Sequence, residues 1–311
     1  MRALAVVAGL SWFCLYSVAQ AQTSATVSSS LETTTAPVNL FGDDKIRFVF
    51  RSDDAGFCHA SNMALERILQ CGVVTAVSVI VNTGWLDETV EILKRYPNVS
   101  VGVHVCLNSE WLPYKWGPVL PAKEVPSLVD EWGHFFGTRK DLVAHQPNSN
   151  EVESEIRAQV ELALRKGLKL SYMDHHMGAA VTTPEMRERF EKVAREKGLG
   201  ISRWLGETQG PVVYSVEPTK KADALIAQMR SITKPGVYLV VCHTLVKTPE
   251  VEVLRDMNVS GPKNMAEHRH AEMEMLCDPR LKQVIHEMQI ELVGYDLLRE
   301  NFLPQMRQPP E

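Results

Sequence analysis

Short apolar runs alternate with helical patterns along the chain from Lys45 onward. The apolar runs are rich in Val, Ile and Leu, and they predict strands over residues 46–50, 74–81, 99–107, 168–173, 201–205, 237–241 and 290–293. The segments between them have apolar residues spaced three or four apart, which predicts helices over residues 61–71, 86–95, 151–166, 184–197, 219–231, 265–276 and 279–288. Strand and helix therefore alternate about seven times.

The helix predicted over residues 151–166 has the clearest pattern. Its apolar residues recur at four-residue spacing and so lie on one face: Val152, Ile156, Val160 and Leu164. Asn150 is a favourable N-cap for this helix. Gly167 is placed to end it in the left-handed conformation.

The helix predicted over residues 265–276 has two features of interest. We expect Met273 and Met275 to pack in the interior. The run Glu-His-Arg-His at residues 267–270 contains side chains that can bind metals. We interpret this run as the solvated start of a helix rather than as a second metal site.

The strands predict an α/β fold with a parallel sheet. Near-continuous Val, Ile and Leu runs indicate strands that are buried on both faces, as in sheets with helical crossovers. The regular alternation favours a (β/α) barrel of the TIM-barrel type, with a distorted or seven-stranded variant allowed. A doubly wound open sheet is the alternative, but the Gly-rich nucleotide fingerprint that would favour it is absent.

The two ends of the chain differ in character from the rest. Residues 1–21 have a positive start, an apolar stretch and an Ala-Gln-Ala cleavage site, which indicates a secretory signal peptide; an uncleaved membrane anchor is the alternative. Residues 22–43 begin with a Ser/Thr-rich segment and are interpreted as a flexible linker. We therefore expect a single barrel domain over residues 44–303, a tail over 304–311, and an exported protein, periplasmic or secreted.

Composition narrows the classes of partner. The chain of 311 residues has 45% hydrophobic and 23% charged residues, which is typical of a globular protein. Its formal net charge of -5 argues against nucleic acid as the main partner. Beyond the first segment, no apolar run is long enough for a stable membrane span. The sequence leaves a homodimer open.

The cysteines do not form a recognisable framework. Six are present, without a Cys-x-x-Cys pair, and Cys14 lies in the predicted signal segment. The remaining five are an odd number, so we expect structural thiols rather than disulfides.

Polar residues interrupt the predicted strands mostly at their late positions. They are Asp53, Asp54, Asn82, His104, Asp174, His175, His176, Arg203 and His243. In a parallel barrel, late strand positions face one end, where such enzymes place their active sites. Two histidines and a carboxylate make a three-ligand site for a catalytic divalent metal, with room for a water. Of two adjacent aspartates, one can bind the metal while the other acts as a base.

A long loop over residues 112–146 departs from the alternation. It holds four prolines and several aromatic residues, among them Trp116. Such a loop is well placed to line a substrate cleft, where sugar rings stack on aromatic side chains. Packing of the aromatic residues on the barrel rim is an equally good interpretation.

The segment Arg-Ser-Asp-Asp-Ala-Gly at residues 51–56 resembles the Asp-Asp-x-Gly opening of the YdjC-like carbohydrate deacetylases. That family includes chitooligosaccharide deacetylase and the hopanoid-biosynthesis deacetylases. Further resemblances follow in the family's order: residues 72–82 to its second strand, 101–104 to its Gly-x-His strand, 126–135 to its Pro-Ser-Leu-x-Asp-x-x-Gly-x-Phe loop, 173–178 to its Leu-Asp-Ser-His-x-Gly motif and 241–243 to its late Cys-His-Pro-Gly motif. The similarity runs from Ile46 to Phe302.

The resemblance implies a role for each matching residue. It makes Asp54, His104 and His176 the metal ligands, Asp53 the general base and His243 the general acid. Arg203 lies where the family has an arginine after its fifth strand. With Asn82 and Trp116, it is a candidate for contact with the substrate.

The sequence departs from the family pattern at three points. His175 stands where the family has serine, so two adjacent histidines compete for one role, and register favours His176. Thr244 and Leu245 replace the Pro-Gly after His243, and Ala55 replaces the usual phenylalanine.

The resemblance implies a metal-dependent hydrolase that removes N-acetyl groups from amino sugars, with zinc or magnesium as cofactor and a carbohydrate as partner. Two alternatives remain open. One is another metal-dependent hydrolase acting on an ester or phosphoester. The other is a secreted carbohydrate-binding protein without activity.

Overall fold

The computed structural model describes residues 38–258 and 261–308. The expected signal segment 1–21 and the linker up to residue 37 lie outside these ranges, so both stay predictions. Among the described residues, no helix has the length and apolar character needed to cross a membrane.

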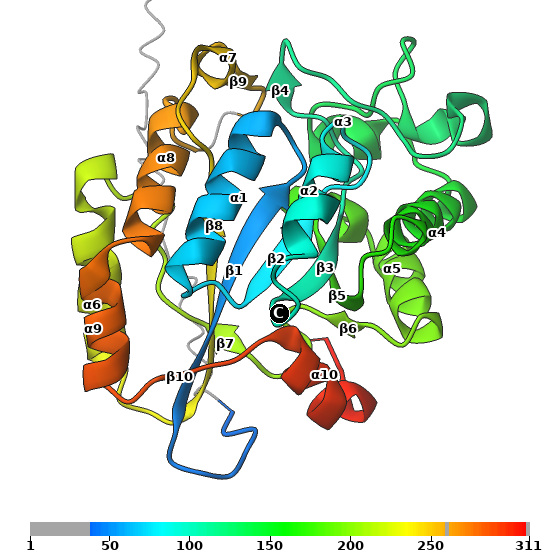
Figure 1. Cartoon of the computed structure of the whole chain (residues 1–311). Coiled ribbons are helices and arrows are strands. Elements are labelled where there is room, and N and C mark those ends of the chain that lie inside the picture. Colours follow the sequence, from blue (N-terminus) through cyan, green and yellow to red (C-terminus); the bar gives the residue numbers. More distant parts are fainter. Residues whose placement is uncertain (1–37, 259–260, 309–311) are drawn as a thin grey trace, which may run out of the picture. The chain divides into compact units, whose positions relative to one another are not determined.

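The core of the fold is a parallel sheet whose seven-strand path runs in the order β6-β5-β3-β2-β1-β8-β7 (Figure 1). Its strands are β1 (Ile46–Ala55), β2 (Ala76–Val79), β3 (Ser100–Val105), β5 (Leu170–His175), β6 (Gly200–Ile201), β7 (Thr208–Gln209) and β8 (Gly236–His243). A short strand, β10 (Glu291–Leu292), also pairs with β1 in parallel. A separate antiparallel pair joins β4 (Trp111–Leu112) to β9 (Arg255–Asp256).

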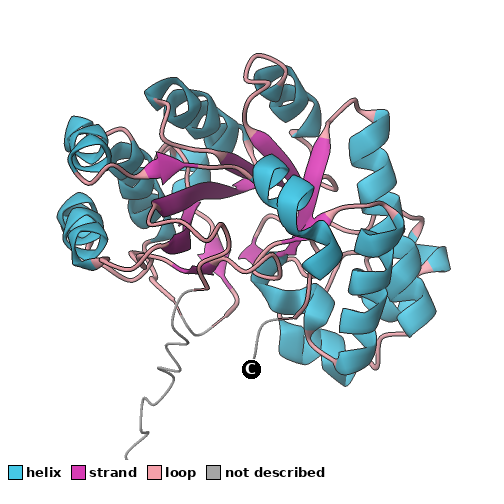
Figure 2. Cartoon of the chain, turned by 90° about the horizontal axis from the view of Figure 1, so that it is seen from below, coloured by secondary structure: helices cyan, strands magenta, loops and turns pink. Residues whose placement is uncertain are grey.

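Helices lie outside the curved sheet, as Figure 2 shows. The longer ones are α1 (His59–Cys71), α2 (Leu86–Leu93), α4 (Ser149–Arg165), α5 (Pro184–Glu196), α6 (Lys221–Ser231), α8 (Met265–Leu276), α9 (Pro279–Glu287) and α10 (Tyr295–Phe302). Shorter helices, α3 (Arg139–Ala144) and α7 (Pro249–Glu252), lie in the loops after β3 and β8. The sheet curls into a half-barrel, which confirms the predicted distorted (β/α) barrel.

Strand β1 is longer than the sequence predicts. The prediction ends at residue 50, whereas β1 continues to Ala55 because Arg51, Ser52 and Asp53 pair with the last three residues of β8. The register of β1 against β2 shifts between Ser52 and Ala55. At this shift Asp54 has φ 64°, a backbone conformation that is uncommon outside glycine. The two aspartates are therefore strand residues rather than loop residues.

Helix α4 forms where the sequence predicts it, with a different cap. Asn148, not Asn150, is the N-cap, and its side chain accepts a hydrogen bond from the backbone N–H of Asn150 at 2.9 Å. Gly167 has φ 89°, which confirms the expected left-handed end.

Helix α8 has the predicted bounds but not the predicted exposure. Met273 and Met275 are buried, as expected. His268, Arg269 and Glu272 are buried as well, because α8 packs against α1 and β8. The interpretation of residues 267–270 as a solvated helix start is therefore wrong for its central residues.

Residues just outside both predicted domain bounds pack against the domain. Phe41, in the predicted linker, packs edge-on against Phe302, with ring centroids 5.0 Å apart. Met306, in the predicted tail, is 4% exposed, and its backbone carbonyl accepts a hydrogen bond from Arg195. The bounds at residues 44 and 303 stay predictions.

The expectation that the five later cysteines are all thiols is wrong for two of them. Cys71, at the end of α1, forms a disulfide with Cys277, just after α8, across 206 residues of sequence. Sequence spacing gave no sign of this pair because the packing of α1 against α8 creates it. Cys58, Cys106 and Cys242 are buried thiols, as expected.

Replacing both bridged cysteines, Cys71→Ser with Cys277→Ser, is expected to lower the free energy of unfolding by about 2–4 kcal/mol, because the bridge restricts the unfolded chain. Denaturant unfolding with and without a reductant measures this. The wild-type protein should lose stability in reductant, and the double variant should not respond to it. A wild-type unfolding curve that reductant leaves unchanged would show that the bridge does not form.

Candidate metal centre

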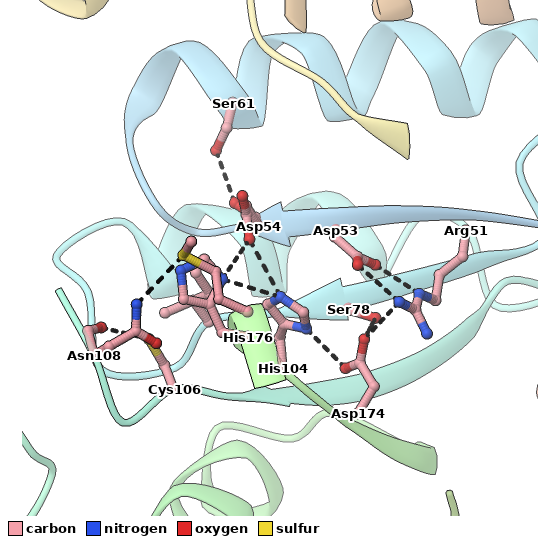
Figure 3. Close-up of polar contacts among 12 residues, drawn as sticks. Arg51, Asp53, Asp54, Ser61, Ser78, His104, Cys106, Asn108, Asp174 and His176 are labelled. Carbon is pink, nitrogen blue, oxygen red and sulfur yellow. Dashed lines mark hydrogen bonds and ion pairs between the residues drawn. The ribbon is translucent and has the colours of Figure 1, made fainter. Parts of the chain in front are cut away.

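Three side chains converge at the carboxyl ends of β1, β3 and β5 (Figure 3). His104 Nε2 and His176 Nδ1 lie 3.3 and 3.2 Å from the same oxygen, Oδ1 of Asp54. The two ring nitrogens are 3.2 Å from each other. These atoms form a nearly equilateral triangle, and all three side chains are buried. The structure thus brings together the three residues that the resemblance implied as ligands.

The second oxygen of Asp54 has a different partner. Arg269 of α8 donates from Nη1 to Asp54 Oδ2 at 2.6 Å. Burial by itself would raise the pKa of Asp54, but Arg269 together with His176 and His104 outweighs it, and the pKa lies well below the usual value. Asp54 is therefore an ionised carboxylate with one oxygen directed at the histidines.

His104 is oriented through its other ring nitrogen. Nδ1 lies 2.9 Å from Asp174 Oδ1, while the second oxygen of Asp174 accepts a hydrogen bond from Ser78 at 3.1 Å. Burial opposes a positive charge on His104, but the carboxylates of Asp174, Asp53 and Asp54 together outweigh that effect and raise the pKa of His104 to about 9. This pairing fixes the ring so that Nε2 faces Asp54.

His176 is oriented in the same way by a carboxylate from the loop after β3. Its Nε2 lies 2.9 and 3.0 Å from the two oxygens of Glu110. Glu110 is 1% exposed and also accepts a hydrogen bond from Asn108 at 3.1 Å. Each histidine therefore has one nitrogen in the triangle and the other on a carboxylate.

The neighbouring histidine, His175, points elsewhere. Its ring lies against Phe190 of α5, with centroids 6.0 Å apart. The chain turns sharply after β5, where Met177 and Gly178 have φ 50° and 74°. Successive strand residues face opposite sides, so only one of the two histidines can reach the triangle, and it is His176.

Asp53 lies beside the triangle and is held by Arg51. Arg51 Nε and Nη2 lie 2.6 and 2.8 Å from the two oxygens of Asp53, and Nη2 also lies 2.9 Å from Asp174. Arg51 Nη1 donates to Ser202 at 2.5 Å. Asp53, His104 and Asp174 also lie close enough to form a second ligand group, but the guanidinium of Arg51 already supplies the positive charge there.

His243 is the register partner of Asp53 on β8. Its backbone N–H donates to Glu272 of α8 at 2.7 Å, and its ring meets the ring of Tyr214 edge-on at 5.5 Å. Burial lowers the pKa of His243 below its usual value. Its Nδ1 is buried without a hydrogen-bond partner in the described part of the chain.

The three candidates for substrate contact lie at different places. Arg203 has φ 72° and donates to Gln209 at 2.7 Å. Asn82 donates to the carbonyl of Gly117 at 2.8 Å, which ties the end of β2 to the aromatic loop. Trp116 is 5% exposed, and its ring lies 6.4 Å from that of His176. Their roles toward a substrate stay predictions.

Aromatic side chains in and next to the loop over residues 112–146 differ in their packing. Trp111 and Trp116 pack around Phe57, with ring centroids 5.9 and 5.8 Å away. Trp132 at the loop's tip is 77% exposed. Trp116 therefore packs in the interior next to His176, whereas Trp132 faces the solvent.

Sequence reasoning missed the residues that surround the triangle. They are Arg51, Glu110, Arg269 and Glu272, all charged and all buried. Arg51 lies within the segment at residues 51–56, so the sequence did offer a reason to consider it near the aspartates. Glu110 lies between polar Ser109 and apolar Trp111, and this context indicates a buried functional residue only weakly.

The triangle fits a zinc ion. Ligand atoms about 2.0–2.1 Å from a tetrahedral metal are about 3.3 Å from one another, close to the three observed spacings. Four buried carboxylates and two guanidinium groups surround the site: Asp53, Asp54, Glu110, Asp174, Arg51 and Arg269. Counted as ionised, they leave about two negative charges, which a divalent cation neutralises. Metal-binding histidines characteristically donate from the other nitrogen to a carboxylate, as both do here.

Glu110→Gln is expected to weaken zinc binding by roughly 10–100-fold, because the ring of His176 loses the charge that orients it and raises its basicity. Competition with a chromophoric chelator measures the affinity. Glu131→Gln, an exposed change in the segment after β4, is the control and should bind zinc as the wild type does. Equal affinities in the two variants would rule out this role for Glu110.

Known proteins of one family are similar to this chain. A family model described as YdjC-like protein matches residues 47–287. A carbohydrate deacetylase of Brevibacillus brevis is 27% identical over 274 residues, covering 81% of this chain and 100% of that protein. A carbohydrate deacetylase of Thermus thermophilus is 27% identical over 263 residues, covering 77% and 89%.

A solved structure has a similar fold. It is described as a cellobiose-phosphate cleavage protein of Enterococcus faecalis V583. The TM-score is 0.66 at 22% sequence identity, and the match covers 82% of this chain and 99% of that one.

Proposed function

This chain belongs to the YdjC-like protein family, and we propose that it is a metal-dependent deacetylase that removes N-acetyl groups from amino sugars. One observation carries the proposal. Two buried histidines, each oriented by its own carboxylate, direct their free nitrogens at one oxygen of Asp54. Relatives named carbohydrate deacetylase support the reaction class.

Asp54, His104 and His176 would hold the metal. Two imidazoles and one carboxylate suit zinc better than magnesium, which prefers oxygen ligands alone. A divalent metal bound there supplies a Lewis acid that polarises a carbonyl and lowers the pKa of water. Three protein ligands leave space for the substrate and for a water molecule.

Asp53 is the proposed general base. Asp53 precedes the proposed ligand Asp54 on β1. Its buried carboxylate lies outside the triangle. Arg51 contacts both of its oxygens and so fixes its orientation. A carboxylate held in this way can accept a proton from the attacking water.

His243 is the proposed general acid for the departing amine. It lies opposite Asp53 in the β1–β8 register, and Glu272 fixes its backbone. Because burial lowers its pKa, His243 is neutral at neutral pH. The proton that it donates would therefore have to reach it during the reaction, and the proton removed from water is the available source.

The substrate class follows from the reaction and from the relatives. An N-acetylated amino sugar or oligosaccharide presents the amide that this site would hydrolyse. Arg203, Asn82 and Trp116 remain the candidates for binding it. The mild negative charge of the chain suits a neutral sugar better than a polyanion.

We also propose that the protein is exported. The signal-like segment at residues 1–21 is the main support. The disulfide between Cys71 and Cys277 adds to it, because such bridges persist mainly in oxidising compartments.

A panel of substrates tests the proposed reaction. Purified protein with added zinc is given an N-acetylated chitooligosaccharide, an O-acetylated sugar and a phosphate monoester. Acetate release from the chitooligosaccharide, faster than release of acetate or phosphate from the other two, is the expected result. Turnover of only the ester or only the phosphoester would replace the proposal with another hydrolase, and no turnover would favour a binding protein.

A further inference from the structure

Arg269 places a positive charge inside the proposed metal centre. Arg269 is 4% exposed, and its guanidinium donates to Asp54 at 2.6 Å. The guanidinium carbon also lies 5.3 Å from the centre of the Trp111 ring. Among the described residues its Nε has no hydrogen-bond partner. A buried cation beside a cation site is unfavourable by itself, so its position needs an explanation.

Helix α8 holds Arg269 firmly in place. Three residues further along, Glu272 accepts from the backbone N–H of His243 and pairs with the buried Lys221 at 2.9 Å. The disulfide at Cys277 attaches the end of the helix to α1. These contacts fix the backbone position on α8 from which the side chain of Arg269 reaches Asp54.

The contact has a consequence for how Asp54 can bind a metal. Oδ1 faces the two histidines, whereas Oδ2 is engaged by Arg269. An unrestrained carboxylate can bind a metal through both oxygens. With Oδ2 taken by a charged donor, Asp54 has one oxygen left for the metal.

We propose that Arg269 is a positioning residue that restricts Asp54 to single-oxygen ligation and thereby keeps a coordination position free for the substrate. This rests on the proposed function, since it assumes a metal at the triangle. The arrangement lowers metal affinity, because Arg269 repels the metal and withdraws negative charge from its ligand. A residue that merely supported the ligands would raise that affinity.

The sign of the change in zinc affinity is therefore the test. Arg269→Gln removes the charge and keeps a polar side chain, and Arg269→Met keeps an aliphatic stem against Trp111. Both variants are expected to bind zinc about ten-fold more tightly than the wild type, because the repulsion is gone. Acetate release should fall, and the visible absorption of the cobalt-substituted protein should weaken as Asp54 adds a second oxygen. Arg280→Gln, on the exposed surface of α9, is the matched control and should change neither property.

Each outcome distinguishes this inference from the proposed function. If the wild type fails to bind zinc or to release acetate, the proposed function is wrong. If the wild type does both but the Arg269 variants bind zinc more weakly or equally, only the role of Arg269 is wrong. Should neither variant fold, the wild-type cobalt spectrum decides: an intense four-coordinate band agrees, and the weak band of a higher coordination number contradicts it.

Discussion

His176→Ala is expected to weaken zinc binding by at least about 100-fold, because the site loses one of three ligands that together supply most of the binding free energy. His175→Ala is expected to bind zinc with nearly wild-type affinity. The two residues are adjacent, but only the ring of His176 lies in the triangle, while that of His175 packs on Phe190. Metal analysis after dialysis, with chelator competition for the affinities, makes the comparison.

The pair of variants controls for folding as well as for binding. His175 is half-buried and packs against Phe190, so its removal also disturbs the packing beside β5. Loss of zinc in both variants with a matching loss of stability would point to unfolding. Loss of zinc in His175→Ala alone would contradict the assignment of His176.

Asp53→Asn is expected to retain zinc and to lose turnover by roughly 10²–10⁴-fold, the usual contribution of a general base. Asparagine keeps the shape of the side chain and can still accept a hydrogen bond from Arg51, so the fold around it should persist. What it lacks is the ability to take a proton. Zinc content and kcat measured on the same preparation separate the two effects.

Asp43→Asn provides the matched control for Asp53. Asp43 also pairs with an arginine of β1, since Arg47 donates to both of its oxygens at 2.7 and 2.8 Å, but at the opposite end of the strand. Its replacement should leave both zinc content and kcat unchanged. A wild-type kcat in Asp53→Asn, or loss of zinc from it, would assign Asp53 a different role.

The fold was predictable because its strands are buried on both faces. Continuous apolar runs such as residues 237–241 mark such strands, and the helix at residues 265–276 was placed with its observed bounds. The two-residue strands β4, β7 and β9 were missed, since pairing with distant segments rather than local pattern creates them. The two aspartates were placed beyond β1 because polar residues normally end a buried strand.

The candidate site was likewise predictable where strand ends place its residues, and not where a loop or helix packing places them. Asp54, His104 and His176 lie at strand ends, so their convergence follows from the parallel sheet. Glu110 and Arg269 reach the site only through the fold of a loop and the packing of α8. A charged side chain in a helix normally indicates an exposed face, which is why Arg269 was interpreted as solvated. The disulfide escaped prediction for the same reason, because tertiary packing alone brings its cysteines together.

We propose that a metal held by Asp54, His104 and His176 is required to remove acetyl groups from amino sugars. The most direct measurement is acetate release from an N-acetylated chitooligosaccharide by wild-type protein, first stripped with a chelator and then given one equivalent of zinc. We expect no release from the stripped protein, recovery on adding zinc, and no recovery in His176→Ala at the same zinc concentration. Equal release before and after stripping, or none at full zinc occupancy, would contradict it.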